Sequence, residues 1–403
     1  MSIIVQKYGG TSVADVEHIK SVAQRLCDTQ DRGNQVVAVI SAMGNSTDRL
    51  LRMAHEISAD PPERELDMLF STGERISVAL LAMAISELGH EAISLSGAQA
   101  GIHTTTSHTR ARITDIDSRR LSETLDSGKI VLVAGFQGIS PDEDITTLGR
   151  GGSDTTAVAL AGALRADECE IYTDVEGVFS ADPNLVPGAV KLDAVSYEEM
   201  LEMAASGAEV LMLRSVEYAQ RYGIPLRVRS SFSDDPGTLV KEEDEKMEKA
   251  VVSAITHTEN ESKLTLLRVP DKPGIAATVF GALADAEVNV DMIIQNVSEQ
   301  GTTDISFTVV QDELPAAQQA LDRICDELGT AYIIGEQMGK VSIVGAGMKS
   351  YPGVAARMFR ALADHDINIE MISTSSIKVS CVIERAQVEK AVRVLHEAFS
   401  LEE

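Results

Sequence analysis

The chain is poor in the residues that stack, cross-link or cross membranes. Among its 403 residues there is no tryptophan, aromatic residues make up 4%, and there are four cysteines. Scarce aromatic side chains leave little material for stacking nucleic-acid bases. Cys27, Cys169, Cys325 and Cys381 form no CxxC pair, which argues against zinc knuckles and disulfide frameworks and favours reduced thiols. No apolar run approaches the roughly 20 residues that span a bilayer, and the first residues lack a secretory signal pattern. We therefore expect a soluble, cytoplasmic protein.

Positive charge is also scarce. Lysine and arginine number 35 against 62 aspartates and glutamates, which gives a formal net charge of −27. Such an acidic surface repels nucleic acid and anionic lipid, so neither is expected as a partner. A site for a phosphorylated ligand must then build its own local positive potential.

Short β-branched runs alternate with amphipathic segments over the first 230 or so residues. Strands are expected at residues 3–8, 35–43, 91–97, 129–136 and 168–174. Helical patterns cover residues 15–29, 65–88, 154–165 and 197–205. This alternation predicts an α/β fold with a largely parallel sheet and helices on both faces. Ligands of such sheets bind at the carboxyl ends of the strands.

The C-terminal part contains a duplicated module. Residues 271–293 and 350–372 align without a gap at an offset of 79, and 12 of the 21 positions from Pro273 to Ile293 are identical. Each copy predicts a βαββαβ order, but the second lacks its sixth element. Because an unpaired sheet edge is a liability, we expect the strand-like run 250–258 to supply it. The predicted domains are residues 1–245, an inserted module at 264–339, and a second module formed by 250–258 and 340–403.

Two glycine-rich motifs are candidates for ligand binding. In KYGGTS, residues 7–12, Lys7 and two glycines could present charge and amides to an anion before a helix, although an ordinary βα turn fits equally. In GRGGSDTT, residues 149–156, Ser153 or Asp154 could cap the next helix. Capping does not explain Arg150 among three glycines, so this motif favours a charged ligand.

Three further motifs are weaker alone. TDVEGVFSADP, residues 173–183, fits a nucleotide-contacting loop or a plain turn, and SAMGNSTD, residues 41–48, offers hydroxyls. STGER, residues 71–75, places Glu74 on a helix, where glutamates are usually solvated. No GxxxxGK[ST] phosphate loop occurs.

Together, these motifs and the PGxAAxxFxALAD repeat resemble the aspartokinases of the amino-acid kinase superfamily, in order along essentially the whole chain. The resemblance implies an amino-acid kinase (carbamate kinase-like) sandwich followed by two ferredoxin-like ACT modules. It implies transfer of the γ-phosphoryl group of ATP, with Mg²⁺, to the side chain of L-aspartate, giving 4-phospho-L-aspartate, the first step of lysine, threonine and methionine biosynthesis. Because a carboxylate is already ionised at neutral pH, positioning and charge neutralisation would suffice for catalysis.

The resemblance also implies roles for individual residues. Lys7 would neutralise the transferring phosphoryl group, and Asp154 would orient Lys7 and the substrate. Arg150 would bind an aspartate carboxylate and Glu74 its ammonium group, with Ser41, Thr47 and Ser153 completing the pocket. ATP would contact Lys7, Gly9, Gly10, Thr173, Asp174, Phe179 and Asp182, and no side chains are expected to hold a resident metal ion. Asn184 and Glu209 replace basic residues common in the family, and Lys191 or Arg214 are candidates to compensate.

The implied regulation is feedback inhibition by lysine and/or threonine at the ACT modules. The expected effector-binding residues are Asp271, Gly274, Gln295, Asn368, Ile369 and Ser375. Because ACT modules generally pair across chains, the resemblance implies a homo-oligomer with a dimer through these modules. An α2β2 assembly with a short regulatory subunit starting near Met247 is the alternative.

The sequence leaves two other functions open. One is a kinase for glutamate or another carboxylate, which the paired C-terminal modules oppose. The other is an amino-acid sensor with a degenerate kinase half, which Asn184 and Glu209 favour. The retention of Lys7, Glu74 and Arg150 opposes the sensor.

Overall fold

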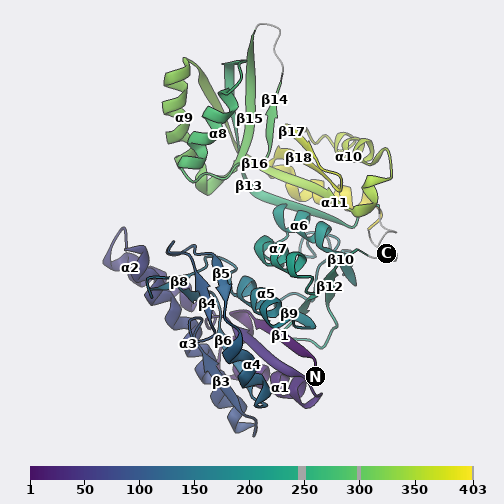
Figure 1. Cartoon of the computed structure of the whole chain (residues 1–403). Coiled ribbons are helices and arrows are strands. Elements are labelled where there is room, and N and C mark those ends of the chain that lie inside the picture. The colour runs from purple at the N-terminus through teal and green to yellow at the C-terminus, as the bar shows by residue number, and fades with distance from the viewer. Residues whose placement is uncertain (244–250, 297–300, 402–403) are drawn as a thin grey trace. The chain divides into compact units, whose positions relative to one another are not determined.

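The computed structural model describes residues 1–243, 251–296 and 301–401 (Figure 1). Backbone contacts divide the chain into two compact units. Unit 1 comprises Met1–Val178, Lys191–Ala204 and Glu209–Met247. Unit 2 comprises Phe179–Val190, Ala205–Ala208 and Glu248–Glu403.

Unit 1 is built on an eight-stranded sheet in the order β10-β12-β11-β9-β1-β2-β6-β3. Only the β11–β12 pairing is antiparallel, and the other neighbours run parallel. The sheet confirms the expected α/β class. Its strands are β1 (Ile3–Tyr8), β2 (Gln35–Ile40), β3 (Ala92–Leu95), β6 (Ile130–Ala134), β9 (Glu168–Thr173), β10 (Ala194–Ser196), β11 (Leu226–Ser230) and β12 (Thr238–Lys241).

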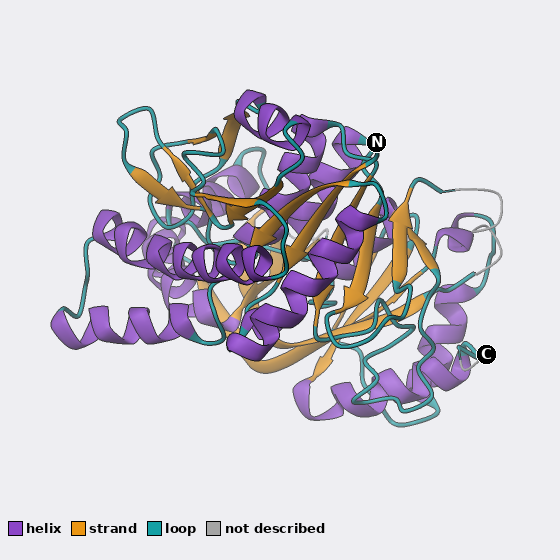
Figure 2. Ribbon diagram, turned by 90° about the horizontal axis from the view of Figure 1, so that it is seen from below, coloured by secondary structure: helices purple, strands orange, loops and turns teal. Residues whose placement is uncertain are grey.

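Helices cover both faces of this sheet (Figure 2). Apolar residues of α1 and α3 form one core with Tyr8, Ile40 and Leu132 of the strands. Successive strand residues point to opposite faces, and Lys7 contacts Asp154 of α5, so α5 lies on the other face. The helices are α1 (Val16–Asp31), α2 (Ser46–Ile57), α3 (Glu63–Glu87), α4 (Arg119–Asp126), α5 (Gly152–Leu164), α6 (Tyr197–Ala205) and α7 (Leu213–Tyr222).

Helix α3 is, among the described residues, the one helix long and apolar enough to cross a membrane by composition. In unit 1 one face of it is packed, because Val78, Leu81 and Ile85 are buried against the main sheet, whereas Ile76 and Met83 are exposed. Burial within the protein therefore explains part of its apolar character.

A second, four-stranded sheet in the order β5-β4-β7-β8 belongs to unit 1 and was not expected from the sequence. Its strands of three or four residues are β4 (Ile102–Thr104), β5 (Ile113–Ile116), β7 (Gln137–Ile139) and β8 (Ile145–Thr147). Residues 105–112 join β4 to β5 and are called the β4–β5 loop below. Strands this short are too brief to show a clear alternating pattern.

Unit 2 contains a single six-stranded antiparallel sheet in the order β14-β15-β13-β16-β18-β17. Residues 254–258 pair with residues 340–344, so the run before the first module supplies the missing strand of the second. The strands expected separately in the two modules are continuous in β13 and β16. The strands are β13 (Ala254–Pro270), β14 (Ile293–Gln295), β15 (Thr302–Val310), β16 (Ala331–Val344), β17 (Met371–Thr374) and β18 (Lys378–Glu384).

Each module has its own apolar core between the sheet and two helices. Helices α8 (Ile275–Asp285) and α9 (Leu314–Leu328) serve the first module, and α10 (Val354–Ala363) and α11 (Val388–Ala398) the second. The four cysteines of the chain are free and buried.

The predicted catalytic domain, residues 1–245, is not continuous in the structure. Residues 179–190 belong to unit 2, where Ala181 and Val186 join the core of the second module. The Ser180 hydroxyl hydrogen-bonds to Nε2 of His396 at 2.9 Å, and both side chains are buried. These contacts explain the departure from the predicted boundary, which sequence composition alone does not reveal.

Candidate active site

The KYGGTS motif spans the last two residues of β1 and the turn that follows. Lys7 Nζ lies 2.6 Å from Asp154 Oδ1, and the two side chains are 13% and 10% exposed. Gly9 N–H donates to Tyr172 O at 3.3 Å, so this expected anion donor is already engaged. A Cβ on Gly10 would lie 3.0 Å from the carbonyl oxygens of Ala42 and Gly44. The glycine therefore allows the turn to pack closely against the SAMGNSTD segment.

A short 3₁₀ turn, Thr11–Val13, overlaps the end of the motif, and the helix expected at residues 15–29 follows it as α1. Helix α1 begins only at Val16, and the Asp15 side chain caps it by accepting from His18 N–H. The helix dipole invoked for anion binding at Lys7 is therefore not provided by α1, because its N-terminus is already capped by a carboxylate.

The GRGGSDTT motif forms the start of α5. Gly151 is the N-cap with φ +67°, so Ser153 and Asp154 lie in the first turn and do not cap the helix. A Cβ on Gly151 would lie 2.0 Å from Met212 Cγ, which explains the glycine. Arg150 is exposed and has no hydrogen-bond or ion-pair partner among the described residues. Its guanidinium group is therefore available to a ligand.

Glu74 is a second buried carboxylate of the site, in addition to Asp154. It lies on α3 and is 3% exposed, and its Oε2 atom has no hydrogen-bond partner among the described residues. Burial raises the pKa of Glu74 to about 7. A Cβ on Gly73 would lie 2.8 Å from Ala42 Cβ, so the preceding glycine lets α3 approach the turn after β2.

One cavity of about 570 Å³ in unit 1 brings these motifs together. The predicted residues in its wall are Lys7, Gly9, Gly10, Ser41, Thr47, Glu74, Arg150, Ser153 and Asp154. The wall also contains Glu209 and residues outside the predicted set, among them Thr109, Phe136, Thr147 and Met212. Thr109 and Thr147 come from the small sheet and its loop, for which the sequence carried no recognisable signal.

The other predicted nucleotide residues lie elsewhere. Thr173 ends β9 and donates to Asp174 Oδ1 at 3.1 Å, and neither lines the cavity. Phe179 and Asp182 belong to unit 2. There, Asp182 Oδ1 accepts from the Asn184 backbone N–H at 2.8 Å and side-chain amide at 3.0 Å, so Asn184 has a local structural role.

Neither candidate for charge compensation has a free cationic group. Lys191 forms an ion pair with Asp235, and Arg214 donates to Ala111 O at 3.3 and 3.4 Å. Glu209 is exposed at the cavity wall, so no replacement for the missing basic charge is found at these positions.

The predicted effector residues occupy both edges of the unit 2 sheet. Gln295 ends β14 at one edge, and Ser375 follows β17 at the other. Gly274 is the N-cap of α8 with φ +98°, and Asn368 donates to Glu370 Oε1 at 3.0 Å. The remaining two residues of the predicted set are Asp271 and Ile369. Because the set includes residues at both sheet edges, one chain does not bring all six together.

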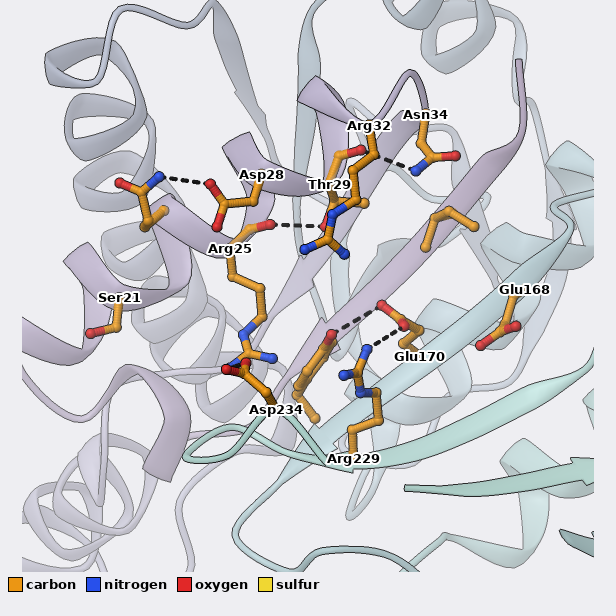
Figure 3. A pocket seen from close by; sticks show the side chains of 13 residues that line it. Ser21, Arg25, Asp28, Thr29, Arg32, Asn34, Glu168, Glu170, Arg229 and Asp234 are labelled. Carbon is orange, nitrogen blue, oxygen red and sulfur yellow. Dashed lines mark hydrogen bonds and ion pairs between the residues drawn. The ribbon is translucent and has the colours of Figure 1, made fainter. Parts of the chain in front are cut away.

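A second hollow of about 480 Å³ lies against α1 and β9, and no sequence motif indicated it (Figure 3). Two of the three arginines in its wall are engaged with protein groups, since Arg229 pairs with Glu170 at 3.1 Å and Arg25 with Asp234 at 3.7 Å. Both guanidinium groups also lie over the Tyr172 ring. Arg25 and Arg229 are therefore held by groups of the protein, unlike Arg150 in the other cavity.

Comparisons with known proteins agree with the motifs and the folds of both units. A model described as the amino acid kinase family matches residues 2–230, and ACT domain models match 263–326 and 341–399. The aspartokinase of Mycolicibacterium smegmatis is 56% identical, with 100% of this chain and 97% of the relative covered. The chain belongs to the aspartokinase family. The aspartokinase of Corynebacterium glutamicum is 54% identical at the same coverage.

Solved aspartokinases have the same fold. Escherichia coli aspartokinase III in complex with aspartate and ADP matches at TM-score 0.84 and 26% identity, covering 98% of this chain and 99% of that one. The same enzyme with lysine and aspartate matches at TM-score 0.76 and 28% identity, covering the same shares. The chain is therefore a kinase with an amino acid kinase domain and two ACT domains.

Proposed function

We propose that this aspartokinase transfers the γ-phosphoryl group of MgATP to the side-chain carboxylate of L-aspartate and releases 4-phospho-L-aspartate and ADP. It would catalyse the first step of lysine, threonine and methionine biosynthesis in the cytoplasm. The observation that carries the proposal is the single cavity lined by the Lys7–Asp154 pair, Arg150 and Glu74. These groups supply complementary charges for each end of an amino-acid dicarboxylate.

The reaction must bring a carboxylate against a triphosphate, so unlike charges around them are essential. The free guanidinium of Arg150 suits a bidentate contact with one aspartate carboxylate. Glu74 suits the ammonium group, whose positive charge would also replace the missing partner of the buried carboxylate. The side-chain carboxylate of aspartate is then the nucleophile and needs no general base, because its reference pKa is near 4.

Lys7 and Asp154 would act together at the transferred group. Lys7 Nζ is held by Asp154 at 2.6 Å, which fixes a long, flexible side chain in one direction. The ammonium group would neutralise charge on the phosphoryl oxygens during transfer. Asp154 is thus proposed as the group that orients Lys7, with the Gly10 amide beside it.

Magnesium would enter as part of the nucleotide substrate. Among the residues that the structure describes, no group of three or more His, Cys, Asp and Glu side chains could hold a metal ion. Mg²⁺ is commonly bound by one or two carboxylates together with substrate phosphates, so the proposal gives this ion to the triphosphate. Thr173, Asp174, Phe179 and Asp182 remain proposed nucleotide contacts.

We further propose feedback inhibition by lysine and/or threonine at the ACT domains. E. coli aspartokinase III has been solved with lysine. In the present chain, Gln295 and Ser375 lie near opposite sheet edges, so a site using both would need a second chain. This supports a homodimer through the ACT domains. The start proposed for a separate subunit in an α2β2 assembly, Met247, lies outside the described residues.

The decisive experiment measures ADP release with aspartate, with glutamate and with neither, in wild-type enzyme and in Lys7→Ala and Asp154→Ala. Aspartate-dependent turnover is expected in the wild type and its loss in both variants, while calorimetry still detects aspartate binding. A preference for glutamate would refute the proposed substrate. Lysine and threonine binding without any MgATP binding would instead favour a sensor. Adding lysine and threonine singly and together tests the regulation.

A further inference from the structure

Asp67 is a buried carboxylate that the proposed reaction does not use. It lies on α3, seven residues before Glu74, is fully buried and is not part of the cavity wall. A carboxylate in such a place is costly unless several donors satisfy it. Its donors here all come from the small sheet and its loop, which border the cavity.

Three neighbouring residues donate to Asp67. The Thr147 hydroxyl donates to Oδ1, and Nδ1 of His108 donates to Oδ2 at 2.7 Å. The backbone N–H of Thr109 is shared between the two carboxylate oxygens, at 3.1 Å from each. Asp67 therefore joins α3 to the β4–β5 loop and to β8 at the same time.

The loop residue held by Asp67 has an unfavourable backbone conformation. Thr109 has φ +61°, in the left-handed region that β-branched residues rarely occupy. Such a conformation persists when surrounding contacts hold it in place, and here the contact is the bifurcated hydrogen bond to Asp67. Thr109 lines the cavity, so its strained conformation is part of the wall.

The same loop packs against the glycine that precedes Arg150. A Cβ placed on Gly149 would lie 3.2 Å from Thr109 O, and Ala111 N–H donates to Thr147 O at 2.9 Å. A movement of Thr109 would therefore reach the backbone of the GRGG turn directly. Lys7 and Gly10 are not contacted by this network.

We propose that Asp67 is a positioning residue for the amino-acid substrate: it fixes the β4–β5 loop and the Gly149–Arg150 turn in the arrangement that binds aspartate. This inference rests on the proposed function, because it assigns Arg150 to the substrate. Asp67 itself does not touch the substrate. It acts through Thr109 and Thr147, and its removal affects the aspartate site more than the nucleotide site.

The test compares Asp67→Ala and Asp67→Asn with the wild type in steady-state assays that vary aspartate and MgATP separately. The KM for aspartate is expected to rise about tenfold in D67A and less in D67N, which keeps one acceptor oxygen, while the KM for ATP stays within about twofold. D67N retains the side-chain volume, so it serves if D67A does not fold.

Thr146→Val is the matched control for stability. Thr146 is fully buried in the same small sheet and its hydroxyl bonds to Thr104 at 2.5 Å, but it does not line the cavity. T146V is expected to lower the melting temperature without changing the KM for aspartate. An equal rise of this KM in T146V, or an equal rise of both KM values in D67A, would reduce Asp67 to a stability role.

A second readout follows from the backbone of Thr109. Glycine adopts a positive φ without strain, so Thr109→Gly should recover part of the aspartate affinity lost in D67A. The double variant is therefore expected to bind aspartate better than the product of the single effects predicts. Strict additivity would contradict the inference. Absence of aspartate-dependent turnover in the wild type would refute the proposed function instead.

Discussion

The pKa of Glu74 predicts how substrate affinity depends on pH. This pKa is raised to about 7 by burial, whereas the proposed contact with the substrate ammonium requires the ionised carboxylate. At pH 6 about one molecule in eleven of the free enzyme is ionised, and at pH 8 about ten in eleven. The KM for aspartate is therefore expected to be about tenfold higher at pH 6 than at pH 8.

The assay measures kcat/KM for aspartate from pH 5.5 to 8.5 at saturating MgATP, in wild type and in Glu74→Gln. The variant is expected to bind aspartate more weakly and to lose the pH dependence of kcat/KM that comes from the Glu74 carboxyl. The pH dependence that comes from titration of the nucleotide phosphates should persist. Calorimetry without nucleotide gives an independent measure, since aspartate binding at pH 7 should release about half a proton. A flat profile in the wild type, or the same slope in E74Q, would refute the reasoning.

The same pKa has a consequence for folding. Because burial raises the folded-state pKa above the reference value of 4.5, the protonated carboxyl favours the folded state. The contribution of this protonation to the free energy of unfolding is fully present below pH 4.5. It is lost as the pH rises to about 7, and the total change is about 3 kcal/mol. E74Q is expected to melt at a higher temperature than the wild type at pH 8, with the difference closing at pH 5.

Three further predictions concern other parts of the molecule. Gly151→Ala places a Cβ against Met212 at a positive φ, so activity is expected to fall with the melting temperature, and a fully active, equally stable variant would contradict this. Lys340→Ala removes the cation that lies 3.1 Å from the buried carboxylate of Glu261. The free energy of unfolding, measured with denaturant, should therefore fall by about 3–5 kcal/mol, and by less in Lys340→Arg, which keeps the charge. Ser180→Ala removes hydrogen bonds to His396 and from Val190 N–H, so the free energy of unfolding should fall by about 1–3 kcal/mol, and an unchanged value would exclude these bonds as stabilising.

The site residues at strand ends could be predicted from the sequence, because their motifs lie next to strong strand patterns. Lys7 lies near the end of a strand-like run, and Arg150 stands among glycines before an apolar helix, so the parallel-sheet rule places both at one edge. The structure indeed brings both into one cavity. The repeat similarly identified the missing strand, since a sheet edge must be satisfied by some segment of the chain.

The hydrogen bonds of Asp67 and Ser180 could not be predicted from the sequence in this way. Both depend on partners distant in sequence, namely Thr147 for Asp67 and His396 for Ser180. A polar residue on a helix or in a loop gives no local sign of such a partner, and burial of a carboxylate is decided by tertiary packing. The raised pKa of Glu74 is hidden for the same reason, since on sequence alone a helix glutamate is expected to be solvated.

The ACT modules are duplicated in sequence but joined in structure. Asp291 and Glu370 are equivalent positions of the repeat at the offset of 79, and each pairs with a lysine of the other module. Lys340 of the second module pairs with Asp291 of the first, and Lys263 of the first pairs with Glu370 of the second at 3.0 Å. Strands β13 and β16 also run through both modules. Separating the modules would therefore break two sheet strands and both crossed ion pairs.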